Sequence, residues 1–144
     1  MKKFTFELEK VLEYRNFERQ QAEGELSKAL AVETEINNNL ENIARQYEAL
    51  KQSMKGCLDF STVMSGNQYI HLLNYQKEEL LKQLAEAKLV SEEKRKILAE
   101  CMKKTTALEK LKERQLEEYK AAADYEEAEL MDDMATAKGN KKSN

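Results

Sequence analysis

The sequence predicts an all-α protein in which two long helices fold back on each other as an antiparallel coiled coil. The chain has 144 residues, enough for one domain. It has no proline and only four glycines, where average usage gives about 7 and about 10. Charged residues make up 35% of the chain, and apolar residues recur in alternating steps of four and three, the heptad pattern of coiled coils. Disordered chains share the high charge but keep no such repeat.

The first helix is expected over residues 4–55, where most positions of the repeat are apolar. Its predicted seam, the stripe that faces the other helix, is Phe4, Leu8, Val11, Arg15, Glu18, Ala22, Leu26, Ala29, Glu33, Ile36, Leu40, Ile43, Tyr47, Leu50 and Met54. An extra step of four between Ala22 and Leu26 predicts a local change of winding. Gly24 lies inside that step and weakens the helix by about 1 kcal/mol relative to alanine, which favours a bend there.

A turn is expected over residues 56–66, followed by a second helix over 67–134 and a disordered basic tail over 136–144. Residues 1–135 thus form the hairpin domain. Gly56 suits the left-handed position after a helix end. Possible N-caps of the second helix are Asp59, Ser61, Ser65 and Asn67. The second seam is expected at Leu80, Leu84, Ala87, Ser91, Lys94, Leu98, Cys101, Thr105 and Leu108, continuing more weakly through Tyr119, Ala122 and Tyr125.

The second helix is longer than the first, so its end should project beyond the hairpin. If the chain folds back near residue 61, Phe4 faces the region of Glu118, and residues 119–134 extend past the start of the first helix. Residues 116–134 hold one lysine and eight acids, a net charge of −7 in a chain whose total is −3. Their apolar side chains, which include Tyr125, Leu130 and Met131, are expected to be available to another protein.

Catalytic and metal-binding patterns are not expected. His71 has no His, Cys or carboxylate companions at ligand spacing. Cys57 and Cys101 would lie roughly 50 Å apart along the hairpin, too far for a disulfide. No glycine-rich phosphate loop is present, and a two-helix hairpin offers no deep pocket for catalysis. We therefore expect a protein that is not an enzyme and that binds neither cofactor nor metal.

Binding to nucleic acid and a membrane-spanning segment are also not expected. The basic run from Lys94 to Arg114 is interleaved with acids and lacks aromatic residues, which favours a solvated helix face over a phosphate track. No stretch approaches the roughly 18 apolar residues of a membrane span, and the opening MKKFTFELEK has no signal-peptide core. These observations predict a cytoplasmic protein.

Three segments carry a resemblance to the FliJ family of flagellar export chaperones. The opening reads F-x-F-x-L-x-x-V-L-x-Y-R-x-x-E, from Phe4 to Glu18. The segment KLKERQ, Lys110 to Gln115, resembles the family's C-terminal helix with its arginine, here Arg114. The acidic stretch Glu127 to Asp133 is similar to the family's ending. The resemblance covers the chain from end to end.

The resemblance implies a soluble component of the flagellar type III export apparatus, similar to the rotor stalk of rotary ATPases. Its paired ends would enter the hexameric export ATPase, through Phe4, Leu8, Leu12, Arg15, Arg114, Asp132 and Asp133. The part nearer the turn would meet the cytoplasmic domain of the membrane export gate, through Ile43, Tyr47, Leu50, Tyr69 and Tyr75. Substrate-specific export chaperones are further implied partners. The protein would associate peripherally with the inner face of the cell membrane at the flagellar base.

Other interpretations remain open for these residues. Most of them lie on the predicted seam, where packing against the other helix explains them without a partner. Leu12 and Tyr14 lie off that seam and are better surface candidates, while Arg15 puts a charge on it, which favours a role in register or partner contact. The alternative functions are a homodimeric coiled-coil scaffold that pairs its stripe between chains, and the equivalent stalk of a virulence secretion system.

Overall fold

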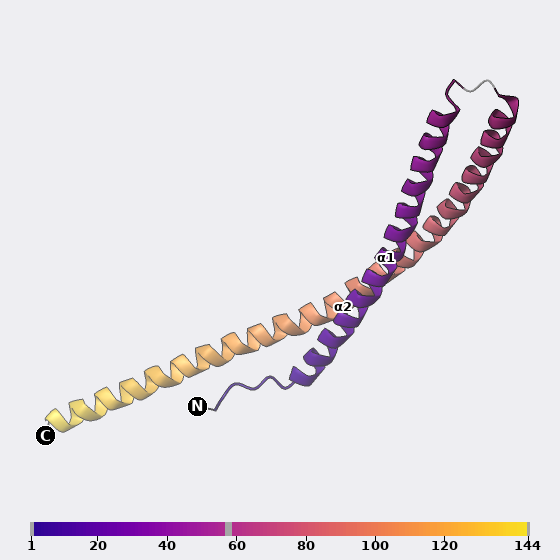
Figure 1. Cartoon of the computed structure of the whole chain (residues 1–144). Coiled ribbons are helices and arrows are strands. Elements are labelled where there is room, and N and C mark those ends of the chain that lie inside the picture. The colour runs from indigo at the N-terminus through magenta and orange to yellow at the C-terminus, as the bar shows by residue number, and fades with distance from the viewer. Residues whose placement is uncertain (1, 57–58, 144) are drawn as a thin grey trace. The chain divides into compact units, whose positions relative to one another are not determined.

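The computed structural model describes residues 2–56 and 59–143, with side chains up to residue 139. It contains two helices, α1 from Glu9–Met54 and α2 from Phe60–Ser143 (Figure 1). No strand occurs in these ranges. The two helices pack against each other, so the predicted all-α helical hairpin is confirmed. Cys57, one of the two cysteines considered above, lies outside the described residues.

The helices do not begin where the sequence pattern placed them. α1 starts at Glu9 rather than at residue 4, because the preceding backbone makes a turn in which the Glu9 amide donates to the Phe6 carbonyl at 3.1 Å. α2 starts at Phe60 rather than at residue 67. Its N-cap is Asp59, whose carboxylate accepts hydrogen bonds from the Ser61 amide at 3.3 Å and the Thr62 hydroxyl at 2.9 Å.

Local sequence also explains where the two helices end. Gly56, just after α1, has a φ of 82°, which confirms the left-handed position predicted for it. α2 runs on to Ser143, past residue 134 where the prediction ended it. Residues 135–143 contain alanines, no proline and one glycine, Gly139, so little interrupts the helix. The division into a hairpin domain of residues 1–135 and a separate tail stays a prediction.

The chain divides into two units, and both helices contribute to each. Unit 1 consists of Met1–Arg19 and Cys101–Asn144, and unit 2 of Gln20–Glu100. Unit 2 contains the turn and the adjoining lengths of α1 and α2, which lie side by side (Figure 1). In unit 2 the Tyr69 hydroxyl donates to Gln46 at 3.5 Å. Nearer the unit's other end, Lys94 lies 4.0 Å from Glu25. Residue numbers thus rise on α2 as they fall on α1, which makes the pairing antiparallel.

The core of unit 2 is a narrow seam of small and apolar side chains. Its buried members are Ala22, Ala29, Ile36, Gly66, Leu73, Ala87 and Ser91. Leu73 and Ser91 are the most enclosed, each 1% exposed. The predicted α2 seam from Leu80 to Leu108 is confirmed, since all nine positions are buried or half-buried and the residues between them are exposed. Leu73 extends this seam two steps toward the turn.

Buried and half-buried positions of α1 follow a spacing of three and four residues that begins at Leu12. Leu12 is buried and Arg15 and Arg19 are half-buried, followed by buried Ala22 and half-buried Leu26. These positions are separated by three, four, three and four residues. Leu8 and Val11, which the sequence placed on the seam, are exposed, whereas Glu18 is half-buried as Arg15 and Arg19 are. The change of winding near Gly24 stays a prediction. Gly24 lies on the exposed side of α1.

We predict that alanine has different effects on the free energy of unfolding at two helical glycines, Gly24 and Gly66. A Cβ at Gly24 meets nothing within 4 Å, so Gly24→Ala should stabilise the fold by about 1 kcal/mol through helix propensity. A Cβ at Gly66 would collide with Met54 Sδ. Gly66→Ala should therefore lose most or all of the same gain, because the methionine must leave its position over the helix.

Urea unfolding of the two variants, each also made in a Met54→Ala background, measures this difference. Removal of the methionine side chain should restore the stabilising effect of Gly66→Ala and leave that of Gly24→Ala unchanged. Equal effects of the two glycine substitutions with Met54 in place would contradict the close approach at Gly66.

Candidate interaction surfaces

The segment before α1 is held against α2 by aromatic contacts in unit 1. The ring centroids of Phe4 and Tyr119 are 5.6 Å apart, with the planes inclined by 53°. The Tyr119 hydroxyl donates a hydrogen bond to the Lys2 carbonyl. Phe6 is buried. The sequence placed Phe4 opposite the region of Glu118, and its contact with Tyr119 confirms that part of the fold-back.

Near the start of α1, the burial of Leu8 and Leu12 is the reverse of what the sequence predicted. Leu12 is only 6% exposed, whereas Leu8 is 38% exposed. The prediction that Leu12 lies off the seam is therefore wrong. The cause is the late start of α1: residues before Glu9 are not helical, so a helical repeat counted from Phe4 reaches the wrong side of the helix. Leu12 packs in the core of unit 1, while Leu8 and Val11 remain partly accessible.

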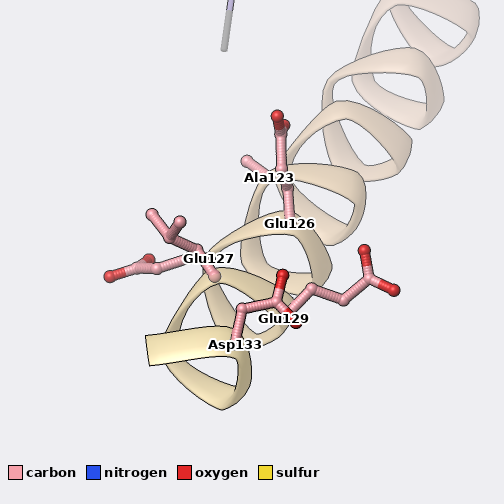
Figure 2. A pocket seen from close by; sticks show the side chains of 6 residues that line it. Ala123, Glu126, Glu127, Glu129 and Asp133 are labelled. Carbon is pink, nitrogen blue, oxygen red and sulfur yellow. The ribbon is translucent and has the colours of Figure 1, made fainter. Parts of the chain in front are cut away.

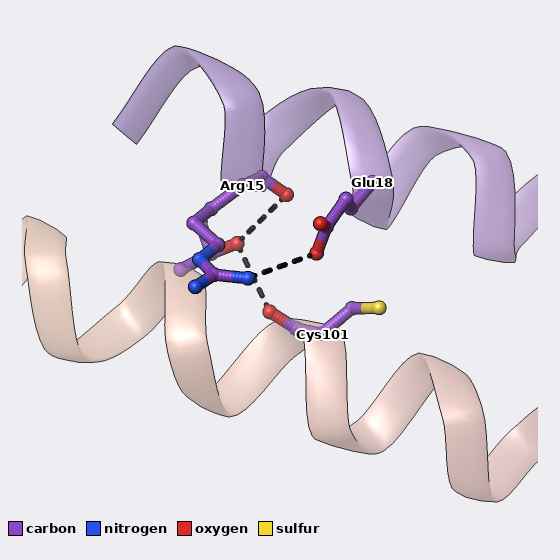
Figure 3. A network of polar contacts seen from close by, with 4 residues as sticks. Arg15, Glu18 and Cys101 are labelled. Carbon is purple, nitrogen blue, oxygen red and sulfur yellow. Dashed lines mark hydrogen bonds and ion pairs between the residues drawn. The ribbon is translucent and has the colours of Figure 1, made fainter. Parts of the chain in front are cut away.

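Arg15 takes part in a polar network between α1 and α2 (Figure 3). Its Nη1 lies 3.2 Å from Glu18 Oε2, and both side chains are partly exposed. Its carbonyl oxygen lies 3.3 Å from the hydroxyl of buried Thr105, which also donates to the Cys101 carbonyl at 3.0 Å. The backbone at Arg15 is thus tied to α2, while its guanidinium stays near the surface.

Tyr14 extends this network onto the outer face of α1. The hydrogen bond that it shares with Glu18 and the charge of that carboxylate raise the pKa of Tyr14 above 10.0. The same hydrogen bond, together with Arg15, lowers the pKa of Glu18. The Arg15 guanidinium lies 5.9 Å from the centre of the Tyr14 ring. Three side chains on one exposed side of α1 are therefore pre-arranged by each other.

An ion pair joins the helices nearly two turns closer to the N-terminus of α1. Lys112 Nζ lies 2.8 Å from Glu9 Oε2. This oxygen is enclosed by its surroundings and accepts no well-directed hydrogen bond within the described residues, so its contact with the lysine is an ion pair. Because Glu9 stands in the first turn of α1, its charge also interacts favourably with the helix dipole. The pair fixes the start of α1 on α2.

The remaining residues predicted to face an ATPase ring lie on the surface of α2. Arg114, Asp132 and Asp133 are exposed. A shallow hollow of about 470 Å³ is lined by Ala123, Glu126, Glu127, Glu129, Leu130 and Asp133. All six side chains project from one stretch of α2 (Figure 2). The hollow is thus a strip along one helix rather than a cavity, and every described side chain from residue 124 onward is exposed.

The residues predicted to face an export gate are distributed over two grooves of unit 2 that share Ile43. Ile43 and Tyr47 line a groove of about 600 Å³ together with Leu40, Leu73 and Leu81. Ile43 and Tyr75 line a second groove of about 430 Å³. Leu50 is half-buried in the seam and Tyr69 is exposed. The structure therefore brings Ile43 and Tyr47 together but places Tyr75 on the other flank of the seam.

The described part of the chain offers no site for metal chemistry. No group of three or more His, Cys, Asp or Glu side chains there could hold a metal ion. His71 is exposed on α2, and Cys101 is a free, half-buried thiol. No helix within residues 2–56 and 59–143 is long and apolar enough to cross a membrane.

The fold is that of a helical coiled-coil hairpin with exposed strips and grooves along its helices. The chain belongs to the FliJ family: the family model described as "Flagellar FliJ protein" matches residues 4–144. Membership makes it a component of the flagellar type III export system, in a family of non-catalytic components. No curated protein and no solved structure is similar enough to count as a match.

The Tyr14–Glu18 contact gives a pH-dependent prediction. The lowered pKa of Glu18 means that its contribution to stability is present above the ordinary carboxyl pKa and is lost as pH falls through the folded-state pKa. The raised pKa of Tyr14 gives a contribution that persists below pH 10.0 and is lost as pH rises further. Tyr14→Phe should therefore raise the pKa of Glu18.

Carbon-detected NMR titration of the Glu18 carboxyl group measures this shift. Tyr125→Phe, an exposed tyrosine near the end of α2, is the matched control and should leave the Glu18 midpoint where it is. An unchanged midpoint in Tyr14→Phe would show that the phenol does not hold the carboxylate.

Proposed function

We propose that this protein is the stalk of the flagellar export ATPase, with its paired terminal segments inserted in the hexameric ring. Family membership supports the setting, and the geometry of unit 1 supports the choice of end. There the N-terminal segment is pinned to α2 by the Phe4–Tyr119 contact, and α2 continues far beyond it. A helical end that leaves its own partner suits insertion into another protein.

The single observation that carries this proposal is the exposure of the last part of α2. After Ala123, every described side chain is exposed, including Tyr125, Leu130 and Met131. Helices in proteins gain most of their stability from packing an apolar face against a partner. Their apolar side chains gain most when a partner covers them. Leu8 and Arg114 lie on accessible parts of the same unit and would extend the contact toward the ring's rim.

The stalk would act through shape and placement. A stiff pair of helices in a ring's central hole favours some arrangements of the surrounding subunits over others, and so promotes assembly and nucleotide turnover. We propose that the grooves of unit 2, with Ile43, Tyr47 and Tyr75, contact the cytoplasmic domain of the export gate. The protein would then link ring and gate at the inner face of the membrane, remain cytoplasmic, and escort substrate-specific chaperones.

ATP turnover by the cognate export ATPase, measured with and without this protein, tests the proposal. Near-stoichiometric stimulation is expected. Asp132→Asn combined with Asp133→Asn should reduce it several-fold, because these carboxylates would face the ring. Both residues are exposed, so their replacement should leave the fold intact. Glu35→Asn with Glu86→Asn removes two exposed carboxylates from unit 2 and serves as the matched control.

The variant Arg15→Ala tests a second predicted ring contact in the same ATP turnover assay. Its guanidinium pairs with Glu18, so circular dichroism must accompany the kinetics. Loss of stimulation with full helicity would support a ring contact. Absence of stimulation by the unaltered protein, together with a stable dimer in sedimentation, would instead favour the homodimeric scaffold.

A further inference from the structure

The last seam position of α1 is a methionine that lies against a glycine of α2. Met54 is half-buried at the end of α1, and Gly66 is buried near the start of α2. A Cβ at Gly66 would collide with the Sδ and Cε atoms of Met54. The thioether therefore occupies the space that a side chain would otherwise fill, and it packs directly on the backbone of α2.

The seam positions around this contact are apolar. Leu50 lies one turn before Met54 on α1, and Val63 and Ile70 stand three residues before and four residues after Gly66 on α2. All three side chains are half-buried, and their intervals continue the heptad spacing of the seam. Their side chains carry no hydrogen-bond donor. The space that Met54 fills therefore suits an apolar group and offers little to a polar one.

The other methionines that the structure describes have different surroundings. Their exposed fractions lie between 48% and 66%, at Met64, Met102, Met131 and Met134. A polar group added to any of these four side chains would remain in water. Met54 is thus the methionine, among those described, at which added polarity would disturb the packing of the two helices.

We propose that Met54 is an oxidation site, at which hydrogen peroxide weakens the turn end of unit 2. We define the turn end as residues 46–54 of α1 and 60–73 of α2. A lone pair on Sδ attacks one peroxide oxygen, so that an S–O bond forms as the O–O bond breaks. The thioether is oxidised to a sulfoxide, and the second oxygen leaves with both protons as water. The sulfoxide oxygen is a strong hydrogen-bond acceptor, so it favours water over the apolar seam.

Loss of the methionine contact should loosen the turn end more than the rest of unit 2. Helix ends open locally at a lower free energy than helix centres. The hydrogen bond between Tyr69 and Gln46 lies in this part, and Tyr47 lines the groove beside it together with Leu73. Oxidation would therefore also reach the surface that the proposed function assigns to the gate. That consequence rests on the proposed function, whereas the loosening itself does not.

Hydrogen exchange of the full chain, measured by mass spectrometry before and after treatment with hydrogen peroxide, tests the proposal. Peptide masses show when Met54 has become a sulfoxide. The amides of the turn end should then exchange at least about fivefold faster, while those of residues 80–98 should change little. Treatment with methionine sulfoxide reductases for both epimers should restore the original rates.

Two leucine variants separate Met54 from the other methionines. Met54→Leu keeps an apolar side chain that peroxide does not oxidise, so its exchange rates should be the same before and after treatment. Met64→Leu removes an exposed methionine of the turn end and, as the matched control, should keep the full response. A peroxide response in Met54→Leu equal to that of the unaltered protein would overturn the proposal. So would unchanged exchange in a chain oxidised at Met54, or a Met54 that stays unoxidised while the exposed methionines are fully oxidised.

Discussion

The structure depends on the close antiparallel approach of α1 and α2 along a seam of small side chains. In unit 2, Ala22, Ala29 and Ala87 are buried where larger residues would separate the helices. Close approach also encloses polar groups, which then require partners. Ser91, only 1% exposed, donates its hydroxyl proton to Glu33 on the facing helix. A buried polar pair of this kind favours one register, because a shift would leave the hydroxyl without its acceptor.

In unit 1, different side chains provide partners for the polar groups that lie between the helices. Buried Thr105 bonds the backbone of both helices, to the Cys101 and Arg15 carbonyls. Arg15 and Glu18 pair at the edge of the seam, and Lys112 meets Glu9. These contacts determine which part of α2 lies beside the N-terminal part of the chain. The described side chains of α2 from residue 124 onward are exposed, and this exposed surface is the basis of the proposed ring contact.

Periodicity made the second helix predictable. Each expected seam position from Leu80 to Leu108 is buried or half-buried, polar members such as Ser91 and Thr105 included. The rhythm held there because no helix end or turn interrupts it. It failed near Phe4, since a repeat assumes a helix and the helix starts only at Glu9. Leu12, predicted to lie on the surface, is therefore in the core. The N-cap of α2 could not be chosen from the sequence either, because only the hydrogen bonds of the Asp59 carboxylate distinguish Asp59 from the other possible caps.

The candidate contact residues were only partly predictable, for a related reason. The seam pattern indicates which side chains face the other helix, but it carries no information about contacts with another protein. Ile43 and Tyr47 are both predicted seam positions, and in the structure they line one groove. The pattern could not separate Tyr75, on the other flank, from them. Their roles toward the gate, like those of Asp132 and Asp133 toward the ring, remain predictions.

Site-specific photocrosslinking in a mixture of purified export ATPase, gate cytoplasmic domain and this protein tests the stalk arrangement most directly. A crosslinker at Met131, on the exposed end of α2, should capture the ATPase, and one at Tyr47, in the unit 2 groove, should capture the gate domain. Capture of the gate domain from Met131, or of the ATPase from Tyr47 alone, would contradict the insertion of the paired ends into the ring.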